Sequence, residues 1–110
     1  MAFQVVYPGV WLDKVRILLS KATNVDLKNE LQAALTGLHD KMSQSPMESG
    51  EPIYKLKHVK LTVYVMVYRY VSAKYAVDED KKIVFLLRFA LATGHPYPPE
   101  FEEILNPKTL

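Results

Sequence analysis

The chain has 110 residues, 49% hydrophobic and 24% charged, a composition typical of one folded globular domain and not of a disordered or fibrous protein. It contains no cysteine, which excludes disulfide bonds and thiolate metal sites and favours a cytoplasmic location. The net charge is only +2, and no apolar run approaches the roughly 20 residues of a membrane helix, so we expect a cytoplasmic protein without a membrane partner.

The N-terminal part of the chain has the pattern of one short strand and two helices. FQVVY (3–7) is rich in β-branched residues and is stopped by Pro8 and Gly9. Apolar residues then recur at helical spacing over about 10–22 and again over about 25–43. Because the linker between the two helices is short, they should form an antiparallel hairpin that covers a sheet.

The C-terminal part has the pattern of a strand meander. A turn-rich cluster at 43–52 ends the second helix. The segments rich in β-branched and aromatic residues that follow are 53–59, 61–68, 71–77 and 82–90. We therefore predict an α+β fold in which the N-terminal strand and the helical hairpin pack on one face of an antiparallel meander sheet of four or five strands.

A single domain over 1–110 accounts for this pattern, with a core over 1–92 and a C-terminal tail over 93–110. Pro98 and Pro99 preset the first turn of a short helix in the tail. No separate domain is expected at this length.

Alternation along the strand 61–68 separates two kinds of side chain. One face consists of Leu61, Val63, Val65 and Val67, and the other of Thr62, Tyr64, Met66 and Tyr68. We expect the aliphatic face to meet the helices. Tyr64 and Tyr68 would then lie on the open face of the sheet.

Positive charge is concentrated on the predicted strands. Residues 52–77 carry five lysine and arginine residues and no acid, although the whole chain is nearly neutral. If the last hairpin pairs Val77 with Ile83, Lys74 and Arg88 become diagonal neighbours on the open face. Such a surface attracts polyanions, and tyrosines between lysines suit stacking on unpaired bases. The simpler interpretation is that the lysines only solvate the strands.

The element order and two short patterns resemble a known family. GEPIYKL (50–56) enters the predicted sheet, and YAVDEDKKIVFLL (75–87) forms its last hairpin. With the order of strand, helical hairpin and meander, they make residues 2–90 similar to the ParE/RelE toxin superfamily, in particular to a diverged group of small bacterial proteins. The resemblance implies a toxin of a type II toxin-antitoxin system, held silent by an antitoxin protein. It also implies one of two activities, because RelE-like members cut mRNA on the ribosome without a metal and ParE-like members inhibit DNA gyrase.

The resemblance implies an RNA-binding surface. Basic residues follow the helices in RelE-like proteins, where this chain has Lys55, Lys57 and Lys60. An arginine lies on their last strand, where this chain has Arg88. The residues that we expect to bind nucleic acid are Lys55, Lys57, Lys60, Lys74, Tyr64 and Tyr68.

Metal-free RNA cleavage needs a group that takes the 2′-OH proton, cations that stabilise the charged phosphorane, and an acid for the leaving oxygen. The candidate catalytic residues are Arg88, Lys57, His58, His95 and Tyr97. Lys57 and Arg88 suit the cationic role, and the two histidines suit proton transfer near neutral pH. His95 and Tyr97 resemble a His and a Tyr near the C-terminus of several family members, but Pro96 separates them here.

These candidates also have plain structural interpretations. Arg88 is the only charged residue in IVFLLRFALA (83–92), so it faces solvent, a bound anion, or an acid such as Glu79 or Glu103. His58 fits a half-buried strand position, and His95 fits a solvated loop.

Two functions of different classes remain open at this point. The first is a RelE-like mRNA interferase, a metal-independent endoribonuclease that acts on RNA or the ribosome through a basic sheet face. The second is a non-catalytic binding module on the same fold, with an antitoxin or a protein target such as gyrase as its partner. The sequence has no glycine-rich phosphate loop and no paired metal-ligand spacing, so we expect neither a metal nor another cofactor.

Overall fold

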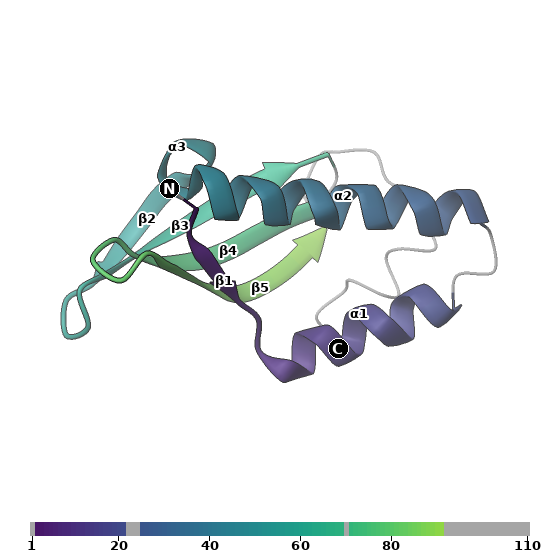
Figure 1. Ribbon diagram of the computed structural model, residues 1–110, viewed down its shortest axis with the longest axis horizontal. Helices are drawn as coiled ribbons and strands as arrows, with labels where there is room; N and C mark the ends of the chain where they lie inside the picture. The colour runs from purple at the N-terminus through teal and green to yellow at the C-terminus, as the bar shows by residue number, and fades with distance from the viewer. Residues whose placement is uncertain (1, 22–24, 70, 92–110) are drawn as a thin grey trace.

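The computed structural model describes residues 2–21, 25–69 and 71–91, which form an α+β fold (Figure 1). The elements in chain order are β1 (Gln4–Val6), α1 (Gly9–Lys21), α2 (Val25–Gln44), α3 (Pro46–Ser49), β2 (Glu51–Leu56), β3 (Leu61–Tyr68), β4 (Val71–Asp78) and β5 (Ile83–Leu91). The predicted tail over 93–110, with its short helix, lies outside the described residues. No helix in the described ranges is long and apolar enough to cross a membrane.

The five strands form one mixed sheet in the order β1-β5-β4-β3-β2. Strands β2 to β5 are the predicted antiparallel meander. The place predicted for the N-terminal strand is wrong, because β1 joins the sheet beside β5 and runs parallel to it, from Gln4 opposite Ile83 to Val6 opposite Phe85. A meander alone would leave β5 as an edge with free backbone groups, and β1 supplies partners for them.

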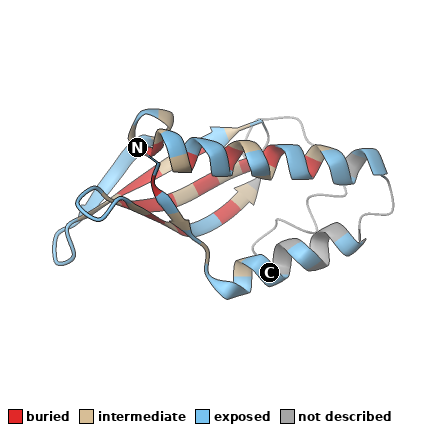
Figure 2. Ribbon diagram, viewed as in Figure 1, coloured by how far each residue is buried: buried red, intermediate tan, exposed pale blue. Residues whose placement is uncertain are grey.

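Helix α2 covers one face of the sheet (Figure 2). Its buried side chains recur at three- and four-residue steps and are Leu31, Ala34, Leu38 and Met42. They share one core cluster with side chains of β3, β4 and β5, such as Met66, Val77 and Phe89. Burying a side chain of this size stabilises the fold by about 1.5–3 kcal/mol, so this layer supplies most of the apolar stabilisation.

Helix α1 lies apart from α2, on the side of β1 and β5 (Figure 1). Trp11 connects it to the sheet, because the indole ring stands edge-on to Phe89 with 5.9 Å between the ring centroids. The two helices therefore do not lie together over the sheet as the predicted hairpin required. Of α1 and α2, only α2 crosses the sheet face (Figure 1).

The faces predicted for β3 are wrong. Tyr64 and Met66 belong to the core beneath α2, and Tyr68 packs against that core. A Cβ atom added to Gly37 of α2 would overlap the ring of Tyr68, so the helix passes directly over this tyrosine. The physical reason is complementarity of size at this point: α2 has no side chain at Gly37, and the large ring of Tyr68 fills the space.

The register of the last hairpin also differs from the predicted one. Val77 pairs with Val84 and not with Ile83, and the pairing shifts by one residue between Lys74 and Tyr75. Leu87 is the extra residue of this β-bulge. Consequently Lys74 and Arg88 face each other directly, where a diagonal arrangement was predicted.

Tyr75 holds α3 against the sheet. Its side chain is fully buried, and its hydroxyl group donates a hydrogen bond of 2.6 Å to the backbone carbonyl of Pro46. Its ring also stacks on Tyr64 with 5.7 Å between the centroids. Gly50 follows α3 at a position where a Cβ atom would run into the Tyr75 hydroxyl, so the chain approaches this tyrosine as closely as glycine allows.

We predict that Tyr75→Phe lowers the free energy of unfolding by about 1–3 kcal/mol, because the Pro46 carbonyl then stays buried without a donor. Urea unfolding followed by circular dichroism measures this change. Tyr54→Phe is the matched control, since Tyr54 is an exposed tyrosine of the same sheet and its change should stay within about 0.5 kcal/mol. Equal effects of the two substitutions would contradict the assigned hydrogen bond.

Candidate nucleic-acid interface

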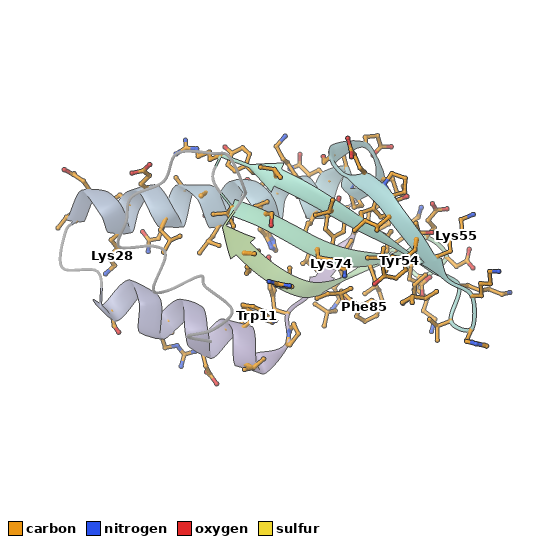
Figure 3. All side chains as sticks on the ribbon, turned by 180° about the vertical axis from the view of Figure 1, so that it is seen from behind. Trp11, Lys28, Tyr54, Lys55, Lys74 and Phe85 are labelled. Atoms are coloured by element: carbon orange, nitrogen blue, oxygen red, sulfur yellow. The ribbon has the colours of Figure 1, made fainter. Side chains whose placement is uncertain are left out.

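The face of the sheet opposite α2 carries a line of paired apolar residues. Strand pairing places them in one row across the sheet, in the order Val6, Phe85, Ala76, Val63 and Tyr54, which we call the central row. Figure 3 shows Tyr54, Lys74 and Phe85 close together over the middle of this face. We call this side of the sheet the open face, because no described helix lies over it.

The middle of the central row is buried. Val63 and Ala76 are 0% and 1% exposed, although neither belongs to the core cluster beneath α2. Tyr54 and Phe85 flank them in the row, so among the described residues these two rings are placed to cover them.

Two cations lie directly opposite each other beside the central row. Lys74 and Arg88 form a cross-strand pair, which we call the cation pair. The ammonium group of Lys74 is 5.4 Å from the centroid of the Tyr54 ring, and Arg88 is exposed. Among the contacts of the described residues, neither cation has a carboxylate partner. Like charges at directly opposed positions destabilise a sheet, so the pair has a cost that a bound anion would remove.

One of the two acids considered as a structural partner of Arg88 does not explain its position. Glu79 follows the end of β4, beyond the pair of Asp78 with Ile83. Arg88 pairs with Lys74, which is five residues before Glu79. At about 3.3 Å per residue, the Cα atoms of Glu79 and Arg88 are therefore at least about 15 Å apart. Glu103 lies outside the described residues.

A second basic surface lies at the hairpin between β2 and β3. A shallow pocket of about 330 Å³ at this hairpin is lined by Lys55, Lys57 and Lys60. We call these three lysines the hairpin cluster. Lys60 has a φ of 55°, in the left-handed region that favours glycine. A side chain in this region costs roughly 1 kcal/mol or more, so the turn keeps a lysine at some expense of stability.

The structure separates two groups that the sequence placed in one active site. β2 ends at Leu56, so Lys57 and His58 lie in the turn and are exposed. Lys55 pairs with Thr62, which pairs with the core residue Val77, and this row lies on the α2 side of the sheet. Lys55 therefore lies on the side of the sheet opposite the cation pair, and Lys57 lies in the turn beyond the end of β2. Arg88 and Lys57 do not share one catalytic group.

The remaining candidates have different positions. Tyr64 and Tyr68 lie under α2 and not on the open face, so neither ring is available to a ligand there. His58 is an exposed turn residue where a half-buried strand position was expected. His95 and Tyr97 lie outside the described residues. Within the described ranges, no three His, Asp or Glu side chains are placed to hold a metal ion.

The buried tyrosines cannot exchange protons near neutral pH. Burial raises the pKa of Tyr64 and of Tyr75 above the usual value of 10. Burial, and to a lesser degree the carboxylate of Asp40, raises the pKa of Tyr7 to about 12. A general acid or base works best when its pKa is near the ambient pH, so these phenols have structural roles.

Sequence reasoning missed Tyr54 and Phe85 as members of the open face. A regular hairpin with Val77 opposite Ile83 would have turned Phe85 toward the helices. The signal that could have found the bulge is the run Leu86, Leu87 and Arg88, because two adjacent apolar residues followed by a charge break the alternation of a strand.

Comparisons of the chain with known protein families, characterised proteins and solved structures find no match. The resemblance to the ParE/RelE superfamily therefore remains an interpretation of short sequence patterns and element order. The inference of function has to start from the open face and the hairpin cluster.

We predict that Arg88→Gln raises the free energy of unfolding by about 0.2–1 kcal/mol at low salt, because it removes the repulsion within the cation pair. The gain should shrink as added salt screens the two charges. Urea unfolding at two salt concentrations measures both effects. Arg88→Lys keeps the charge and should bring no gain. A loss of stability in Arg88→Gln would mean that the guanidinium has a stabilising partner.

Proposed function

We propose that the chain is an RNA-binding toxin of the RelE type, which acts on mRNA through its basic surfaces. The observation that carries this proposal is the cation pair on the open face. Among the described residues neither of these two directly opposed cations has a carboxylate partner, so the pair lowers the stability of the sheet there, and a phosphate group would turn that repulsion into attraction. The resemblance of GEPIYKL and YAVDEDKKIVFLL to the toxin superfamily supports the same function.

The two basic surfaces suit different parts of a nucleic-acid backbone. Arg88 carries a planar guanidinium that can donate two parallel hydrogen bonds to one phosphate, and Lys74 adds a second charge beside it. The hairpin cluster supplies three more cations around a concave surface. Sequence-independent contacts of this kind provide most of the affinity of RNA-binding proteins that do not read bases.

Cleavage of RNA needs both a fixed cation and a proton carrier. Arg88 is placed to stabilise a charged phosphorane, the role that fixed cations perform in phosphoryl chemistry. A proton carrier is also required, and His58 lies in the hairpin turn away from Arg88. His95 and Tyr97 remain the candidates for that role. The described residues support the binding part of the proposal, and the proposed cleavage needs a proton carrier such as His95 or Tyr97.

The edge strand favours a second candidate, a non-catalytic module that binds an antitoxin or another protein such as gyrase. All six residues of β2 are exposed, among them the apolar Ile53 and Leu56. A free edge of this kind can accept a strand from a partner chain. This candidate uses β2 and does not need the cation pair.

We predict that affinity for a labelled single-stranded RNA of about ten nucleotides falls steeply with salt, by about 0.7 in log affinity per log salt for each phosphate contact. Replacing both Lys74 and Arg88 by Gln should lower the magnitude of this slope by about 1.4. Fluorescence anisotropy at several salt concentrations measures it. Lys28→Gln is the control, because Lys28 lies on α2 at the other end of the molecule (Figure 3). An unchanged slope in the double variant would remove the cation pair from the interface.

We also predict that induction of the chain in a bacterium arrests growth and cleaves mRNA, and that Arg88→Ala abolishes both effects. Growth curves and primer extension on abundant transcripts are the measurements. Arrest with intact mRNA would contradict the nuclease and favour a protein target. If neither chain arrests growth, the toxin proposal is wrong.

A further inference from the structure

The open face offers two aromatic rings to a ligand beside its two cations. Tyr54 is 44% exposed, and Phe85 is half-buried at the other side of the Val63 and Ala76 floor. The rings come from strands at opposite ends of the meander and lie over the same surface (Figure 3). An open sheet face with exposed rings and cations has the two components that bind unpaired nucleic acid, which are a stacking surface and charges for the backbone.

The distance between the cation pair and the central row fits one nucleotide. Lys74 and Ala76 are two residues apart on β4, so the row of the cation pair lies about 7 Å from the central row. The Lys74 ammonium already lies 5.4 Å from the Tyr54 ring centroid. A phosphate on the cation pair therefore places the attached base within reach of the rings. A base in a duplex is stacked between its neighbours and cannot use them.

We infer that Tyr54 and Phe85 form a base-stacking platform, so that the ligand of the open face is an unpaired strand whose phosphate lies on Lys74 and Arg88. This inference rests on the proposed RNA-binding function and makes it more specific, because it excludes duplexes and purely electrostatic binding. Charge complementarity favours a polyanion over a protein surface for this face. The two rings separate an unpaired strand from other polyanions.

The test compares three labelled ligands of about eight nucleotides: a uridine strand, the same backbone with abasic residues, and a duplex. Stacking contributes about 1–3 kcal/mol per base, so the uridine strand should bind at least about 5-fold more tightly than the abasic strand. Tyr54→Leu and Phe85→Leu keep an apolar side chain and remove the ring. Each should weaken binding of the uridine strand by about 5-fold or more and leave binding of the abasic strand unchanged.

Tyr54→Phe keeps the ring and should recover the affinity for the uridine strand that Tyr54→Leu loses. Lys28→Gln is the control that should leave this affinity unchanged, because Lys28 lies on α2 away from the open face (Figure 3). Circular dichroism checks that each variant is folded, and Tyr54→Leu at the exposed edge strand serves if Phe85→Leu does not fold. Equal affinity for the uridine and abasic strands would overturn the platform and leave the RNA-binding function standing. Equal affinity for the duplex and the uridine strand would also overturn the platform and leave the RNA-binding function standing. No binding of any of the three ligands at low salt would overturn both proposals and favour the protein-binding module.

Discussion

Burial of Tyr75 beneath the junction of α2 and α3 is the constraint that decides which side of the sheet stays open. Its hydroxyl group is satisfied by the Pro46 carbonyl, and Gly50 leaves just enough room for it. Successive side chains of a strand point to opposite faces, so an inward Tyr75 fixes Lys74 and Ala76 outward. The neighbouring strands follow through their pairing. The buried Tyr75 side chain thus fixes the orientation of the cation pair toward the open face.

The bulge at Leu87 allows β5 to place Phe89 in the core and Arg88 on the open face. Without an extra residue, Tyr75 opposite Leu86 would be followed by Lys74 opposite Leu87 and by Ala73 opposite Arg88, which would turn the guanidinium toward the core. Burying that charge without a partner would cost several kcal/mol. With the bulge, Phe89 takes the inward position beside Ala73, and Arg88 lies outward beside Lys74. The stability of the core and the charge of the open face therefore depend on the same irregularity.

Local pattern was sufficient to predict the five strands and the two long helices, but it missed the short helix α3 in the segment 43–52 and did not predict which faces of the strands meet a helix. The strand 61–68 was predicted with the bounds that it has, because β-branched and aromatic residues are dense there. Both of its faces are apolar, so alternation divides Val63 from Tyr64 without saying which one meets a helix. Gly37 in α2 favours the aromatic face, because the ring of Tyr68 fits against it. The parallel pairing of β1 with β5 joins residues about 80 positions apart, which no local pattern predicts. For the site, the cation pair was predicted on the open face, whereas Phe85 depended on the bulge.

Features that lower stability are concentrated on the strands and turns that face away from the core. The cation pair opposes like charges, and Lys60 keeps a left-handed backbone that glycine would adopt more easily. Such departures from local consistency are expected where function and not folding selects the residue. Lys55 lies on the α2 side of the sheet and the cation pair lies on the open face, so one ligand that contacts both must bend around the β2 edge.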